Sequence, residues 1–428
     1  MLILYLLILL LAIVLSRSRA GCVTPVIIFM GAWVTMALLY MADSRFFQMF
    51  PYQIPPKAHI VRLGSMVAFL GGTAAVWLLF PRKVISPVAS SYSRPLMLLT
   101  WIWLAVLGVC AVSRGWIVYQ TYGEILGALP RVRNDFVSGA LIFPRFTGLA
   151  TLAANLCALN LGVLFGQGRR VWMPTGLFLV LAIINDAAMA DKGGLRLIIL
   201  LGLTCYYTRT LLSAEKFRGY TKYVLAGLAA FCLYSAITYF RVEDQSATML
   251  EVSIKHFYGN IAGNIGSSAW FLEHPWPTAP WGAYSFNGYY ALLGIPGIEG
   301  FRSADFFNAD IVAIGIFNTT DYVAYLTADF GLWGALTISA LLGGISAWLF
   351  LRAKYTRSIP FTQVLAFFAT GLVISVRGFY FGAAGFAVTI LLIGAQPILL
   401  RTLWPMKVRR NRPLQSVMSW PTPSMRAP

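Results

Sequence analysis

Long apolar segments separated by short polar ones make up most of this chain. A helix needs roughly 17 to 25 apolar residues to cross about 30 Å of hydrocarbon. Suitable segments lie near 1–16, 23–41, 61–80, 96–113, 147–166, 173–189, 195–208, 223–240, 322–351, 360–376 and 379–400. The pattern predicts an all-α fold: a polytopic integral membrane protein with about 11 transmembrane helices.

Three of these segments need separate treatment. The first has no basic region before its apolar core and another segment follows it at once, so we interpret it as a helix rather than a signal peptide. The segment 195–208 is the shortest. Only Arg377 and Gly378 separate the last two, which predicts a tight hairpin.

The composition agrees with a membrane protein. The chain is 58% hydrophobic and 11% charged, whereas a soluble domain has about 25% charged residues. The cysteines all fall within or at the edges of apolar segments. They are Cys22, Cys110, Cys157, Cys205 and Cys232. This placement indicates buried side chains and neither a disulfide framework nor a metal site.

Charge predicts the orientation. With the N-terminus outside, the inner segments hold most of the 33 basic residues and one acid, Glu215. The short loops 16–21, 166–171 and 351–358 carry bases and no acid, as the positive-inside rule requires. We therefore expect the N-terminus on the outer side of the membrane and the C-terminus in the cytoplasm. The net charge of +18 then reflects topology and contact with membrane lipids, and no nucleic-acid partner is needed to explain it.

Two long outer loops interrupt the membrane domain, which we place at residues 1–400. They are residues 114–146 and 241–321, and a basic, proline-rich cytoplasmic tail follows at 401–428. The second loop is rich in tryptophan, tyrosine and phenylalanine, which is too much apolar surface for a disordered linker. We expect it to be structured, and to be the working surface of a membrane enzyme.

Local patterns subdivide the second loop. Residues 248–257 and 259–271 have helical character. The segment His274-Pro275-Trp276-Pro277 must break a helix. Residues 282–300 are expected to be rich in turns.

Arginine is the main chemical resource of the outer side. The sequence has no Walker loop, HExxH, CxxC or GxSxG motif and only three histidines. The outer arginines are Arg114, Arg131, Arg133, Arg145, Arg196, Arg241, Arg302 and Arg377. A guanidinium grips phosphate through two parallel hydrogen bonds, so such a group suits a lipid-linked diphosphate. For each arginine the alternative to phosphate binding is a structural role, in which the side chain reaches to the membrane surface or pairs with an outer acid.

Two arginines and one segment stand out. Arg196 lies at the mouth of an apolar segment and Arg377 at the predicted hairpin tip. The alternative for Arg196 is a structural salt bridge, because Asp186 is a suitable partner for Lys192 or Arg196. In the segment 317–331, polar residues share one helical face along the entrance to a membrane helix. They are Asn318, Asp321, Tyr325 and Asp329. An N-cap at Asn318 or Thr319 and an interfacial tyrosine belt explain the Asn, Thr and Tyr residues, but not the carboxylate of Asp329.

These motifs resemble the Wzy-type polysaccharide polymerases, the oligosaccharide repeat unit polymerase family. The resemblance runs from Asn318-Thr319-Thr320 through Tyr325 to Asp329-Phe330-Gly331-Leu332-Trp333-Gly334, with Gly194-Leu195-Arg196 at the mouth of a middle segment. The O-antigen ligases are more distantly similar, but they usually carry histidine where Asn318 stands.

The resemblance implies polymerisation of undecaprenyl-diphosphate-linked oligosaccharide repeat units into O-antigen, capsule or exopolysaccharide, at the outer face of the membrane. It implies no metal or cofactor, and makes a chain-length regulator and a flippase candidate partners. The sugar hydroxyl of one unit would attack the anomeric carbon of the other, and undecaprenyl diphosphate would leave.

Roles for individual residues follow from that mechanism. We expect Arg196 and Arg377 to stabilise the leaving diphosphate, and Asp321 or Asp329 to act as the base, with Glu273 and His274 as further candidates. The residues expected to bind substrate are Arg302, Arg145, Arg114, Arg241, Asn318, Tyr325, Glu273, His274, Trp276 and Trp281.

Two other functions remain open. An O-antigen ligase or another lipid-linked sugar transferase would use similar chemistry. A transporter or flippase would place ionisable residues at mid-membrane, often in two related halves, whereas here the charges gather at the outer ends of the apolar segments.

Overall fold

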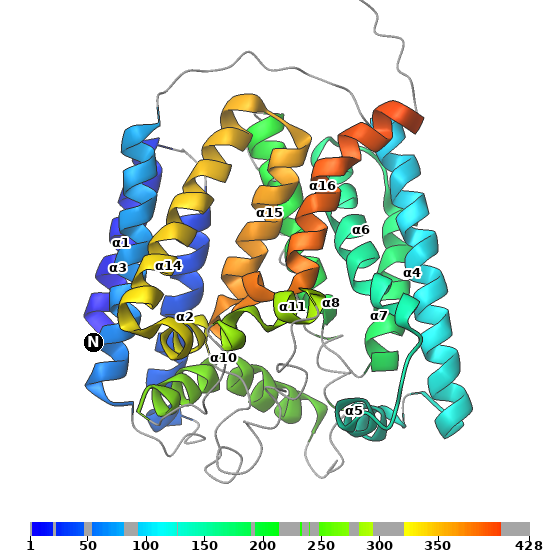
Figure 1. Cartoon of the computed structure of the whole chain (residues 1–428), viewed down its shortest axis with the longest axis horizontal. Coiled ribbons are helices and arrows are strands. Elements are labelled where there is room, and N and C mark those ends of the chain that lie inside the picture. Colours follow the sequence, from blue (N-terminus) through cyan, green and yellow to red (C-terminus); the bar gives the residue numbers. More distant parts are fainter. Residues whose placement is uncertain are drawn as a thin grey trace, which may run out of the picture.

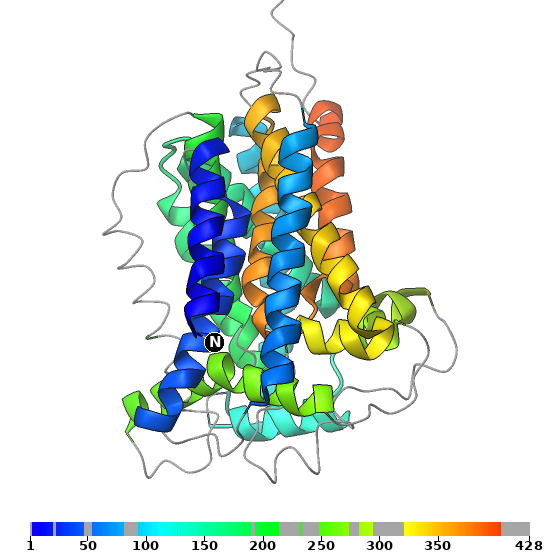
Figure 2. The same cartoon turned by 90° about the vertical axis from the view of Figure 1, so that its left-hand side faces the viewer.

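The protein is a helical bundle whose helices run up and down between two ends (Figures 1 and 2). The computed structural model describes residues 2–19, 23–46, 54–80, 93–125, 127–189, 193–213, 248–273, 282–293 and 321–403, with positions 232 and 239. Within these ranges the regular structure is helical and contains no strand.

Ten apolar helices of the described residues belong to the bundle. Its helices are α1 (Leu2–Arg19), α2 (Pro25–Phe46), α3 (Pro56–Leu79), α4 (Ser93–Tyr122), α6 (Leu149–Gly166), α7 (Trp172–Met189), α8 (Gly193–Tyr207), α14 (Tyr322–Thr356), α15 (Ile359–Ile374) and α16 (Ala384–Leu403). Among the described residues, 8 stretches are long and apolar enough to cross a membrane, and α1 and α16 contain shorter apolar helices. The class of a multi-pass membrane protein is thereby confirmed. Apart from positions 232 and 239, the predicted segment 223–240 lies outside the described residues.

Charge separates the two ends. The upper end in Figure 1 carries the last turns of α1, α3, α6, α8, α14 and α16. Every charged residue that the structure describes there is basic: Arg17, Arg19, Arg94, Arg169, Arg170, Arg209, Arg352, Lys354, Arg357 and Arg401. The acidic residues of the described ranges lie at or toward the opposite end, which we call the loop end. This asymmetry has the form that the positive-inside rule predicts.

Three further helices lie at the loop end (Figures 1 and 2). They are α5 (Leu129–Ser138), α10 (Met249–Glu273) and α11 (Ala283–Leu293). The expected helices 248–257 and 259–271 form one continuous helix, α10. The expectation that 282–300 is rich in turns is wrong over α11, whose start is capped by a residue from another helix. The expected loop 114–146 begins later than predicted, because α4 continues to Tyr122.

Helix α14 is two helices joined at a break. Gly331 has φ +67° and ψ −179°, a left-handed backbone region that glycine enters without steric cost. The residues before it, 322–330, lie across the loop end, and those after it enter the bundle (Figure 2). We call 322–330 the N-terminal segment of α14. The break explains how a 35-residue helix fits a membrane of ordinary thickness.

Helices α3 and α14 pack backbone against backbone. A Cβ at Gly72 would lie 1.8 Å from the carbonyl oxygen of Ala340, and a Cβ at Gly343 would lie 2.0 Å from that of Phe69. Small residues allow this close approach, which is a common way to join helices in lipid.

We predict that Gly72→Ala lowers stability, because the added methyl group must push the two helices apart. Overpacking of this kind costs about 1–3 kcal/mol, which corresponds to a melting temperature lower by several degrees. Thermal unfolding in detergent measures the effect. Gly71→Ala is the matched control, since a Cβ there meets nothing within 4 Å. Equal melting temperatures for the two variants would contradict the packing.

Candidate functional site

A short turn between α15 and α16 is the point where α2, α8, α11 and α14 meet. It contains two 3₁₀ helices, η3 (Ser375–Arg377) and η4 (Tyr380–Gly382). We call residues 375–382 the central turn. It takes the place of the tight hairpin that the sequence predicts, and it carries Arg377 as expected.

Helices α2 and α14 hold the first half of the central turn. The indole Nε1 of Trp33 donates a hydrogen bond to Ser375 Oγ at 3.1 Å. The ring of Tyr322 stacks on Phe379 with centroids 6.4 Å apart. The ring of Tyr325 lies 3.8 Å from the position that a Cβ of Gly378 would occupy. Tyr325, a predicted substrate residue, therefore lies beside this turn.

Helix α11 holds the second half. The hydroxyl of Tyr289 donates to the carbonyl oxygen of Phe381 at 2.9 Å. A Cβ at Gly382 would lie 1.6 Å from the carbonyl oxygen of Ser285, so only glycine fits where the two backbones touch. Helix α11 and the central turn therefore form one packed unit.

Arg196 reaches the same turn from α8. Its Nη1 donates to the hydroxyl of Tyr380, and its guanidinium carbon lies 5.5 Å from the centre of the Tyr380 ring. The side chain is half-buried, and a cation over an aromatic face is stabilised by the ring quadrupole. The structure thus brings the side chain of Arg196 into contact with the turn that carries Arg377. The side chain of Arg377 is exposed.

Asp186 shapes the start of α8. Its Oδ2 accepts a hydrogen bond from the backbone N–H of Gly194. A carboxylate at a helix N-terminus satisfies an otherwise unpaired donor and favours the helix dipole. Asp186 therefore helps to fix the helix start from which Arg196 extends.

Asp329 caps α11 from outside that helix. Its Oδ1 accepts from the backbone N–H of Tyr284 at 3.1 Å, and its Oδ2 accepts from that of Ser285 at 2.6 Å. Both donors belong to the first turn of α11, whose N–H groups have no partner within the helix. The backbone N–H of Gly282 and the side chain of Ser285 also interact with this carboxylate, so the start of α11 surrounds Asp329 with donors.

Two tyrosines of α11, Tyr284 and Tyr289, keep their protons. Burial and, to a smaller extent, the neighbouring charge of Asp329 together raise the pKa of Tyr284 to about 12. Burial also raises the pKa of Tyr289. Both phenols therefore act as hydrogen-bond donors at neutral pH and not as bases.

Asp321 is fully buried and paired. Its Oδ2 lies 2.9 Å from Nε of Arg62, and both side chains are 0% exposed. Its Oδ1 accepts from the N–H of Ala324 at 3.1 Å and so caps the start of α14. These bonds give Asp321 a structural task, and its assignment as a base stays a prediction that the geometry favours less than that of Asp329.

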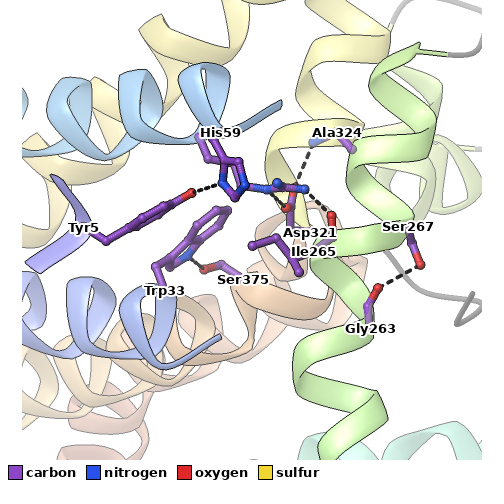
Figure 3. A network of polar contacts seen from close by, with 10 residues as sticks. Tyr5, Trp33, His59, Gly263, Ile265, Ser267, Asp321, Ala324 and Ser375 are labelled. Atoms are coloured by element: carbon purple, nitrogen blue, oxygen red, sulfur yellow. Dashed lines mark hydrogen bonds and ion pairs between the residues drawn. The ribbon is translucent and has the colours of Figure 1, made fainter. Parts of the chain in front are cut away.

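Arg62 belongs to a polar group that sequence reasoning missed. Figure 3 shows this group, in which Tyr5 of α1 and His59 of α3 lie beside the ion pair. The Tyr5 hydroxyl and His59 Nδ1 are 3.2 Å apart. The available signal was a basic residue near the start of an otherwise apolar segment. Tyr380 was also missed, because an aromatic residue beside a membrane helix is common.

Arg114 and Arg145 lie in a different neighbourhood. Arg114 is buried in α4 and donates to Asn185 Oδ1 at 2.7 Å, and its guanidinium lies 5.8 Å from the Phe143 ring. Arg145 is exposed in η1 (Arg145–Gly148). The contacts of Arg114 with Asn185 and Phe143 lie away from the central turn, and the roles of Arg114 and Arg145 in binding stay predictions.

The remaining predicted residues fall outside the described part of the chain. They are Arg241, His274, Trp276, Trp281, Arg302 and Asn318. Glu273 ends α10, and only its backbone position is described.

The described residues contain no group of three or more metal-ligating side chains. Comparisons of the chain with protein-family models, curated proteins and solved structures found no significant match. The function is therefore argued from the geometry of the central turn and from the sequence motifs around it.

Proposed function

We propose that this protein is a Wzy-type glycan polymerase of the bacterial inner membrane. It would join undecaprenyl-diphosphate-linked oligosaccharide repeat units into O-antigen, capsule or exopolysaccharide. In this proposal the basic end faces the cytoplasm and the loop end faces the periplasm, where lipid-linked repeat units are extended.

The observation that carries the proposal is the meeting of Arg196 with the turn that bears Arg377. These two residues are far apart in sequence, and the sequence motifs assign both to the leaving diphosphate. A diphosphate leaving group gains negative charge as its bond to the sugar breaks. Positively charged donors fixed in advance stabilise that charge most effectively in a site with little water.

Asp329 supplies the second part of the mechanism. The acceptor hydroxyl would lose its proton to the Asp329 carboxylate and attack the anomeric carbon of the donor. The bond between that carbon and the diphosphate oxygen breaks, and the bonding electron pair leaves with undecaprenyl diphosphate. The packed unit of α11 and the central turn would keep the base and the two arginines in a fixed relation.

The position of the charges favours this function over transport. Among the described bundle helices, charged residues lie toward the helix ends, and Asp329 lies next to the break in α14. A transporter or flippase would be expected to place ionisable groups near the middle of the membrane. A ligase or another lipid-linked sugar transferase is chemically closer, and the nature of the accumulated intermediate separates it from a polymerase.

We predict that Arg196→Ala and Arg377→Ala each lower the rate of chain extension by about 100-fold or more, the usual effect of removing a preorganised donor. Glycan length on a gel and turnover of purified lipid-linked repeat units measure this. Arg131→Ala is the matched control. It is exposed at the loop end and lies 3.9 Å from Glu124.

A graded variant tests how Arg196 acts. Tyr380→Phe removes the hydroxyl that accepts from Arg196 and keeps the aromatic ring. A hydrogen bond to a charged group contributes about 1.5–3 kcal/mol, so the rate of chain extension is expected to fall by about tenfold or more.

Full-length glycan from both Arg196→Ala and Arg377→Ala, at normal abundance in the membrane, would refute the diphosphate role.

Loss of the protein should leave a defined intermediate. We predict that deletion of the gene causes accumulation of single repeat units on undecaprenyl diphosphate. Mass spectrometry of extracted lipid carriers identifies them. Finished polymer stranded on its carrier would indicate a ligase instead, and an unchanged carrier pool would rule out both transferases.

The orientation can be tested independently. We predict that a reporter active only outside the cytoplasm gives signal when inserted at 282–300 and no signal when fused after residue 403. The second fusion is the control, because it follows the last turn of α16 at the basic end. Signal from the tail fusion alone would invert the topology and remove the proposed site from the periplasm.

A further inference from the structure

Arg62 joins three helices at one buried point. It belongs to α3, its Nε donates to Asp321 Oδ2 at 2.9 Å, and its Nη2 donates to the carbonyl oxygen of Ile265 in α10 at 2.5 Å. Asp321 in turn caps α14. Figure 3 shows the two residues that Arg62 contacts, Asp321 and Ile265. A second ion pair, Arg131 with Glu124, is exposed.

The N-terminal segment of α14 depends on contacts at its two ends. Gly331 separates it from the rest of the helix, and a helix shorter than about 12 residues has little stability of its own. Asp321 fastens the start of the segment to Arg62. Asp329 fastens its end to the first turn of α11. The two carboxylates that the sequence suggested as bases are therefore the two attachment points of one short element.

A buried ion pair is a costly way to make this attachment. Removing two charges from water costs several kcal/mol each, and apolar replacements often give equal or greater stability. A guanidinium, however, can donate in two directions at once, which a lysine ammonium on a flexible stem does less well. The geometry therefore gives Arg62 a task in orientation: it ties α14 and α10 to the same residue of α3.

We infer that Arg62 is a positioning residue that sets the N-terminal segment of α14, and with it Asp329 and α11, relative to α10 and the central turn. Arg62 touches no substrate in this scheme. It acts through Asp321, which transmits its position along the segment to Asp329. We call the contacts of Arg62 with Asp321 and Ile265 the clamp. The inference rests on the proposed function only for the reaction that is being positioned, since the clamp fixes distances between helices whatever the reaction is.

The clamp can be tested by distances between spin labels. In a chain with its five cysteines replaced, labels at Leu250→Cys in α10 and Leu292→Cys in α11 report the relation that Arg62 is inferred to fix. Both side chains are exposed, at 62% and 61%. Labels at Ile60→Cys in α3 and Leu341→Cys in the second part of α14 give a reference pair, also exposed at 62% and 58%.

We predict that Arg62→Lys broadens or shifts the α10–α11 distance distribution and leaves the reference pair unchanged, because lysine keeps the charge but cannot hold both partners. Arg131→Lys is the matched control at the exposed ion pair, and should change neither distribution. Asp321→Asn provides a second variant. Asparagine still caps α14 but weakens the bond to Arg62, so the same distribution should change.

The rate of chain extension measures the functional consequence of moving Asp329 and α11. A displacement of about 1 Å can lower a rate by about 100-fold, so Arg62→Lys should lower kcat by at least tenfold and change KM less than threefold. An unchanged α10–α11 distribution in both Arg62→Lys and Asp321→Asn would overturn the inference, and so would a proportional rise in KM with kcat intact. A changed distribution in a protein whose unaltered form extends no glycan would overturn the proposed function and leave the clamp standing.

Discussion

The free energy of placing a charge among apolar helices controls the architecture of the loop end. A charged group in this environment is stable only when other groups satisfy it. Arg62 pairs with Asp321 and donates to Ile265, although its Nη1 has no hydrogen-bond partner among the described residues. The charge of Asp329 is held by the N–H groups of α11. Arg114 is satisfied in part by Asn185. Each of these bonds also joins two elements, so the charges that are costly to bury are the ones that fix how the helices meet.

The central turn is the product of these attachments. Helices α2, α8, α11 and α14 each send a side chain or a backbone group to residues 375–382. Aromatic rings fill much of the space between them, with Phe286 lying 5.3 Å from Phe379 and 6.0 Å from Phe330, measured between centroids. Backbone contact at Gly382 removes the remaining freedom between the turn and α11. A site built in this way is preorganised, which is what stabilisation of a charged leaving group requires.

The division of the molecule into a basic end and a loop end is consistent with the proposed reaction taking place at the loop end. The described bundle surface is largely apolar, and the charged residues lie toward its two ends. A lipid-linked substrate can keep its isoprenoid in the bilayer while its diphosphate and sugars remain at the loop end. The arrangement thus fits a reaction at the membrane surface better than movement of a solute through the bundle.

The sequence by itself determined the class of the protein, the approximate positions of most helices, and the positions of Arg196 and Arg377 at the ends of apolar segments. These features depend on local properties: the length of an apolar segment, the bias of basic residues and the position of an arginine at a segment end. The partners of the charges could not be predicted, because Arg62 and Asp321 are 259 residues apart in the chain, and the cap of α11 comes from Asp329, 44 residues beyond Ser285. Only the tertiary structure decided that Asp321 is a buried anchor, that residues 283–293 are helical and that α14 breaks at Gly331, because each depends on groups that folding alone brings together.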